Sequence, residues 1–208
     1  MDKSNNFECL EKCGCLMTKE ELLVLLSSWE NLWVAKVSQT DLTPYFPLLM
    51  ELAMEGDDAV SWRAAWIADK LSFKKPELLL PWSRKLVTLL PGLTHTGKKR
   101  QFLRMVTQVP VDQEVAGVLF DYCQERLFDP REPVAVKAYA MQILYHISED
   151  QKELKPEVAE TIRQVMEIYP ESGIQARCRN LIRKLSREIS SANRAMAPAH
   201  RKITPVGP

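Results

Sequence analysis

The stretch DPREPVAVKAYAMQIL, residues 129–144, decides the fold of this chain. It places Asp129-Pro130, then Pro133, ahead of a segment whose apolar residues recur with helical spacing. Asp129 can bond the free amides of a turn, and Pro133 suits the first turn of a helix. The apolar side of that helix is predicted to consist of Val136, Ala140, Ile143, Leu144 and Ile147, which align on one face of an α-helix.

The same apolar stripe recurs every 38 residues. Besides the stripe that begins at Val136, equivalent stripes begin at Val60, Lys98 and Ile174, and only the one at Lys98 starts with a polar residue. A second amphipathic segment precedes each stripe, and these segments run over 42–55, 77–90, 113–128 and 152–169. Repeats of this length predict stacked helix pairs, none of which can bury its apolar side alone.

One more helix is predicted ahead of the first pair. Thr18 and Glu21 have the spacing of a capping box, which begins a helix from Glu20 to about Val37. Its apolar stripe would cover the open end of the stack and consists of Leu22, Leu25, Leu26, Trp29, Leu32 and Trp33.

The run Asp129-Pro130, Pro133, Val136-Lys137 resembles the turn and second helix of a HEAT repeat, and residues 56–60 and 169–174 are looser copies. Residues 94–97 lack the Asp-Pro, and Ser61 and Gln175 replace the basic residue. The resemblance covers about residues 42–187 and extends to short, uncharacterised bacterial HEAT-like proteins. It implies an all-α, right-handed α-solenoid of about four helix pairs plus the capping helix, over residues 18–190. Residues 1–17 and the basic tail 191–208 are predicted to be flexible.

Composition favours a cytoplasmic globular protein. Hydrophobic residues make up 46% of the chain and charged residues 26%. No apolar run approaches the roughly 18 residues of a membrane span, and residues 1–15 lack the apolar core of a signal peptide. The net charge of +1 combines +7 over residues 172–208 with −6 over residues 1–171. A basic end can indicate an acidic partner, or it can be a solvated helix face with a basic tail.

The sequence offers little for catalysis. It contains no nucleotide-binding loop, HExxH, GxSxG or paired CxxC motif, and its three histidines are scattered. No cofactor is therefore expected. Cys9, Cys13 and Cys15 cluster near the start, either as part of a metal site that lacks a nearby fourth ligand or as a reduced segment.

The candidate binding surface is the concave face that the second helices of a HEAT-like stack form. Residues opposite each apolar stripe are predicted to face a partner there. Trp, Tyr and Arg, which are enriched in binding hot spots, are prominent among them. The alternatives are that the tryptophans pack between helices and that the arginines pair with neighbouring acidic residues. The candidates are Trp62, Trp66, Asp69, Arg100, Arg104, Gln142, Tyr145, Asn180 and Arg183.

The sequence is compatible with three functions. The leading one is a non-catalytic scaffold that binds another protein or peptide, with acidic character, since solenoids provide extended concave surfaces. The second is weak nucleic-acid binding, which Lys98-Lys99-Arg100, Arg104 and the basic end favour. The third is a DNA alkylation-repair glycosylase, because one family of such enzymes is built from HEAT-like repeats and Trp62, Trp66 and Asp69 suit a cationic base.

Overall fold

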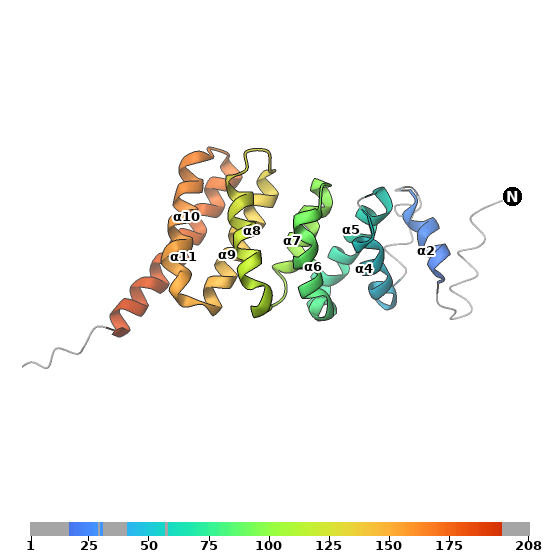
Figure 1. The fold of residues 1–208 in the computed structure, drawn as a ribbon, viewed down its shortest axis with the longest axis horizontal. Helices are drawn as coiled ribbons and strands as arrows, with labels where there is room; N and C mark the ends of the chain where they lie inside the picture. The colour runs from blue at the N-terminus through green and yellow to red at the C-terminus, as the bar shows by residue number, and fades with distance from the viewer. Residues whose placement is uncertain (1–16, 29, 31–40, 57, 197–208) are drawn as a thin grey trace, which may run out of the picture. The chain divides into compact units, whose positions relative to one another are not determined.

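The computed structural model describes residues 17–28, 30, 41–56 and 58–196, and all regular structure in that part of the chain is helical (Figure 1). The described residues form nine α-helices and four short 3₁₀ helices, which confirms the predicted all-α class. Consecutive helices pack in pairs. The chain divides into two compact units, residues 1–112 and residues 113–208, and the single domain predicted over 18–190 stays a prediction.

The first helix pair of the first unit joins α4 (Phe46–Met54), which the 3₁₀ helix η1 (Thr43–Tyr45) precedes, to α5 (Ala59–Lys74). Gly56 lies in the turn with φ of 64°, the left-handed conformation that commonly ends helices. Asp58 caps α5, because its side chain accepts a hydrogen bond from the Ser61 N–H at 2.7 Å. Helix α4 packs along α5, and α5 packs against the next second helix, α7 (Thr96–Val106).

The first helix of the next pair differs from its prediction. Residues 77–90 are not one α-helix but a succession of η2 (Pro76–Trp82), α6 (Ser83–Leu89) and η3 (Leu90–Gly92). Pro81 explains the interruption, since proline lacks an N–H and its ring clashes with the preceding turn of an α-helix. The side chain of His95 caps α7 by accepting a hydrogen bond from the Lys98 N–H at 3.2 Å, a role that the sequence pattern does not assign.

The predicted N-terminal helix is interrupted at Ser27 and Ser28, and Glu30 is helical again. Helix α2 (Lys19–Leu26) begins with the predicted capping box, in which Thr18 Oγ1 accepts from the Glu21 N–H and Glu21 Oε2 accepts from the Thr18 N–H. It ends at Leu26, where the Ser27 hydroxyl and N–H both donate to the Val24 carbonyl and close the last turn. Leu22, Leu25 and Leu26 are buried as predicted. The rest of the predicted stripe, Trp29, Leu32 and Trp33, lies outside the described residues.

The second unit contains two complete helix pairs. Helix α8 (Gln113–Phe128), whose bounds match the prediction, packs on α9 (Val134–Asp150). After η4 (Lys152–Leu154), helix α10 (Lys155–Ile168) packs on α11 (Ser172–Met196), and α9 contacts both. Helix α11 extends to Met196, so the tail predicted from residue 191 begins within it. Residues 1–16 and 197–208 lie outside the described residues.

The turn at Asp129 has the predicted chemistry. Asp129 Oδ1 accepts from the Arg131 N–H at 2.9 Å, and the Arg131 guanidinium donates to both carboxylate oxygens at 3.0 and 2.9 Å. These hydrogen bonds hold the pKa of Asp129 below its usual value. Pro133 has φ of −61° and caps α9 from one residue before its first turn, rather than within that turn as predicted.

The cores of the two units contain most of the predicted stripes. Seven residues predicted to be buried are so, with exposed fractions of 2% or less: Ala64, Phe102, Met105, Ala140, Ile143, Cys178 and Leu181. Val60 is half-buried instead, because it lies in the first turn of α5 beside the chain entry. Among the described residues, no helix is both long and apolar enough to cross a membrane.

Candidate functional site

In the first unit, the candidate residues on α5 differ widely in exposure. Trp62 is half-buried, and its ring lies 5.0 Å from the imidazole of His95, centroid to centroid, with an interplanar angle of 34°. A Cβ at Gly97 would lie 2.7 Å from Trp62 Nε1, so the absent side chain leaves room for the indole. Trp62 therefore packs against the start of α7, which is the alternative that the sequence left open.

An ion pair joins the next candidates. Arg104 Nη1 on α7 donates to Asp69 Oδ2 on α5 at 3.0 Å. The Asp69 side chain is only 3% exposed and that of Arg104 is 26% exposed. Asp69 is thus buried, contrary to its predicted place on an open face. The guanidinium of Arg104 also lies 4.9 Å from the ring centroid of Phe73, which is 66% exposed.

The environment of Asp69 disfavours its charge. Burial raises the pKa of this carboxyl, and the charges of Arg104, Lys70 and Arg100 oppose that rise. Asp69 Oδ1 is buried without a hydrogen-bond partner among the described residues. The pair therefore fixes Arg104 and adds little negative potential to the surface.

Asp69 should make the free energy of unfolding depend on pH. Because its folded-state pKa is raised above the usual 3.8, protonated Asp69 stabilises the fold at pH values below 3.8, and this contribution is lost as the pH rises through the folded-state pKa. The unfolding free energy of the wild type minus that of Asp69→Asn should therefore be larger at about pH 4 than at pH 7. At pH 7 the two proteins should differ by less than about 1 kcal/mol, since water still solvates part of Arg104.

Urea unfolding at several pH values measures this difference. Glu77→Gln, at an exposed site in the same unit, serves as the control. A difference for Asp69→Asn that stays constant with pH, or that grows as the pH rises, would contradict the assignment.

Of the basic residues predicted near the start of α7, only Arg100 is exposed. Lys98 is 1% exposed and Lys99 is 8% exposed. Lys98 Nζ donates to the carbonyl of Gly56, and it lies 3.4 Å from the Ser61 hydroxyl. The predicted cationic patch is therefore wrong in its two lysines, because both are buried and the long side chain of Lys98 reaches back to the main chain of the preceding pair.

In the second unit, the candidates on α9 belong to a polar network. Gln142 Nε2 lies 2.7 Å from His146 Nε2, and Arg177 Nη1 donates to Gln142 Oε1 at 3.1 Å. Burial lowers the pKa of His146. Tyr145, which is 7% exposed and so not open to a partner as predicted, donates its hydroxyl to Glu188 Oε1 at 2.8 Å.

Lys155 completes this network from the first turn of α10. Its Nζ donates to Glu149 Oε1 at 2.8 Å and to Glu188 Oε2 at 2.7 Å. The Lys184 ammonium lies 5.3 Å from the Tyr145 ring centroid. The remaining candidates, Asn180 and Arg183, are exposed on α11 as predicted.

Comparison with protein families identifies the architecture. A family model described as a HEAT repeat domain matches residues 28–185. The chain belongs to the HEAT repeat family. No curated protein and no solved structure matched it.

In three of the HEAT repeats, the same position forms side-chain hydrogen bonds that the sequence pattern does not assign. It follows the first stripe residue and holds Ser61, Lys137 and Gln175. The Ser61 hydroxyl donates to the Asp58 carbonyl at 3.0 Å, and Lys137 Nζ donates to the carbonyls of Leu127 and Asp129. Although the basic residue is replaced at two of these sites, all three side chains satisfy main-chain oxygens at or near the turn.

Gln175 is the fourth-repeat counterpart of Lys137. Its Nε2 donates to the carbonyl of Met166 at 2.5 Å and to that of Tyr169 at 2.7 Å. The carbonyls at the end of an α-helix have no partner within it, so these bonds close the end of α10. The 38-residue register could have revealed the position, because Ser61, Lys137 and Gln175 are all polar and differ by multiples of 38.

The cysteines are the remaining candidates for metal binding. Cys9, Cys13 and Cys15 lie outside the described residues. Within the part of the chain that the structure describes, no group of three or more His, Cys, Asp and Glu side chains is placed to hold a metal ion. Cys123 and Cys178 are buried free thiols, and burial raises the pKa of both.

Proposed function

We propose that this protein is a non-catalytic interaction scaffold that binds another protein on the exposed sides of its second helices. HEAT repeat domains are typically protein-interaction scaffolds and are generally non-catalytic. The observation that carries the proposal is that these helices combine a buried stripe with accessible polar side chains. Arg100 on α7 and Asn180 and Arg183 on α11 are exposed, and Trp66 on α5 is half-buried.

The exposure of the basic residues favours a protein over a nucleic acid. With Lys98 and Lys99 buried and Arg104 paired with Asp69, three of the four α7 cations that favour nucleic-acid binding are engaged, which leaves Arg100 and the basic end of the chain to that alternative. Phosphate-backbone binding depends on many free cations. The glycosylase alternative needs an accessible carboxylate, and the carboxylate of Asp69 is buried.

Site-specific photo-crosslinking in the native cell tests the proposal. A photoreactive phenylalanine analogue at position 100 or 180 should yield covalent adducts with a defined protein, which mass spectrometry identifies. The same analogue at Glu51 on α4 and Glu160 on α10, both exposed sites on first helices, serves as the matched control.

Direct binding then completes the test. The identified partner, once purified, should bind the wild type with an affinity that falls at least about tenfold in the variant with glutamate at the crosslinking position, and a tenfold loss corresponds to about 1.4 kcal/mol. Adducts that form equally at the control sites, or adducts with nucleic acid alone, would overturn the proposed function.

A further inference from the structure

Helix α11 carries an unbalanced row of arginines. Its 25 residues include six basic side chains and one acidic side chain, Glu188. Arg179, Arg183 and Arg187 follow one another at intervals of four residues, and all three are exposed. With a rise of 1.5 Å per residue, their Cα atoms are spaced by about 6 Å along one side of the helix.

Nothing described in the structure neutralises this row. Glu188 is engaged by the Tyr145 hydroxyl and by Lys155. No hydrogen bond or ion pair found among the described residues involves the guanidinium groups of Arg179, Arg183 or Arg187. Like charges four residues apart destabilise an isolated helix, so this arrangement weakens the helix unless another molecule supplies negative charge.

The other basic side chains at the centre of α11 contrast with the row. Arg177 donates to Gln142, and Lys184 lies over the Tyr145 ring. Both contacts hold their side chains toward α9, away from a partner. The row is thus a separate feature of α11 and does not belong to the network inside the second unit.

A pocket adjoins the C-terminal end of the row. Its lining includes Arg187 and Glu188 together with the apolar Ile189, Ala192 and, from α10, Pro156. A ligand that pairs with the arginines could therefore also place an apolar side chain beside Arg187. A single protein segment can supply both the carboxylates and the apolar side chain.

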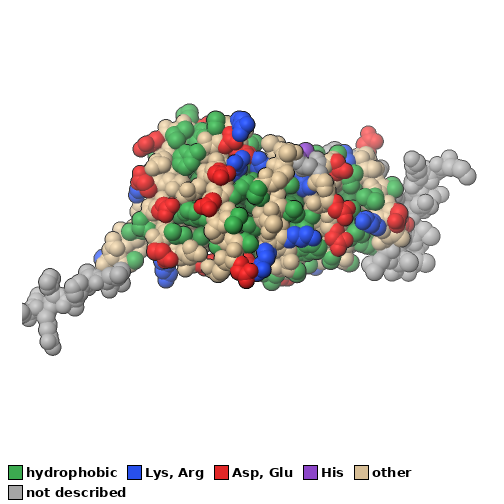
Figure 2. Space-filling view, viewed as in Figure 1, with side chains coloured by type: hydrophobic (Ala, Val, Ile, Leu, Met, Phe, Trp, Pro, Cys, Tyr) green, Lys and Arg blue, Asp and Glu red, His purple; other side chains and the backbone are tan. Residues whose placement is uncertain are grey.

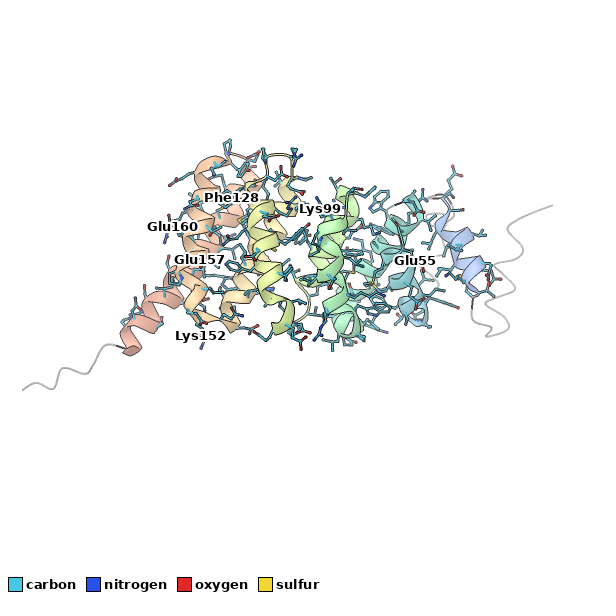
Figure 3. All side chains as sticks on the ribbon, viewed as in Figure 1. Glu55, Lys99, Phe128, Lys152, Glu157 and Glu160 are labelled. Carbon is cyan, nitrogen blue, oxygen red and sulfur yellow. The ribbon has the colours of Figure 1, made fainter. Side chains whose placement is uncertain are left out.

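The rest of the unit that carries the row is acidic, which favours a narrow ligand. Residues 113–171 of the same unit hold twelve acidic and six basic side chains. Glu157 and Glu160 are exposed on α10 (Figure 3), and Figure 2 shows several acidic side chains on the viewed face of this unit. A duplex that contacts many phosphates would meet this negative potential, whereas a single acidic segment can follow the row alone.

We propose that Arg179, Arg183 and Arg187 form a docking row for an acidic segment of a partner protein. Guanidinium groups pair with carboxylates through two parallel hydrogen bonds, and glutamates four residues apart on a helical segment have the same spacing of about 6 Å. This inference rests on the proposed function and names the chemistry of its partner on α11.

Fluorescence anisotropy with the purified full-length chain tests the row. The probe is a fluorescein-labelled helical peptide with glutamate at every fourth position and a leucine after the last one. A peptide with glutamine at those positions and a labelled DNA duplex are the comparison probes. In about 0.15 M salt, the glutamate peptide should bind at least about tenfold more tightly than either comparison probe.

Variants locate the binding. The triple variant Arg179→Gln, Arg183→Gln and Arg187→Gln should lose at least about tenfold in affinity for the glutamate peptide without a fall in Tm, because removing like charges relieves repulsion. Arg163→Gln on α10, where the arginine pairs with Glu160, is the matched control and should bind like the wild type.

Three results would overturn the docking row: equal binding of the glutamate and glutamine peptides, tighter binding of the DNA duplex, or an equal loss in Arg163→Gln. If the peptide fails while crosslinks at positions 100 or 180 still identify a protein, the row is wrong and the scaffold function stands. Failure of both would overturn the proposed function as well.

Discussion

Ala140→Trp is expected to lower the free energy of unfolding by about 1–3 kcal/mol or more, because it overfills a packed core. Ala140 is fully buried on α9, the helix that contacts α8, α10 and α11. Its neighbours in the stripe, Ile143 and Leu144, are also fully buried, so no space is left for an indole. The helices must separate or the side chain must adopt a strained rotamer.

Urea unfolding followed by circular dichroism measures this effect. Ala176→Trp is the matched control, because Ala176 is exposed on α11 of the same unit. That substitution should change the unfolding free energy by less than about 0.5 kcal/mol. If both variants unfold like the wild type, the packing register assigned to α9 is wrong.

The core of each unit could be predicted from the sequence because helical periodicity reports which side of a helix is apolar. The stripe that begins at Val136 is buried throughout, and α8 has its predicted bounds of 113 and 128. Pro81 interrupts a segment that periodicity alone predicts to be one helix. Periodicity continues through 77–90, but one missing N–H is enough to divide the segment.

The candidate surface was harder to predict, because a helical wheel gives the direction of a side chain and not the depth of its surroundings. Asp69 lies on the predicted side of α5, yet Arg104 from the next pair covers it. Tyr145 is likewise covered through Glu188 and Lys184. Such cover depends on contacts between helices that lie 35 or more residues apart in the chain, and local spacing carries no information about them.

Lys137 is a charged residue that belongs to the core. It is 2% exposed, and its Nζ donates to the carbonyls of Arg126, Leu127 and Asp129 at the end of α8 and in the turn that follows. The ammonium also lies 4.4 Å from the ring centroid of Tyr169. These main-chain oxygens have no helical partner beyond the end of α8, so the lysine replaces the next turn of the helix.

Lys137→Met should therefore lower the unfolding free energy by about 2–3 kcal/mol, since methionine keeps the unbranched stem but leaves buried carbonyls without a donor. Gln175→Met, at the equivalent position of the last repeat, removes neutral hydrogen bonds and should cost about 1 kcal/mol. Lys152→Met serves as the control, because Lys152 is exposed in the same unit. Urea unfolding of the three variants measures the series. The order Lys137, Gln175, Lys152 would establish that the basic residue of this repeat stabilises the turn by closing the helix end. An equal and small effect at all three positions would show instead that water satisfies these carbonyls, and that the HEAT turn depends on the Asp129 hydrogen bonds alone.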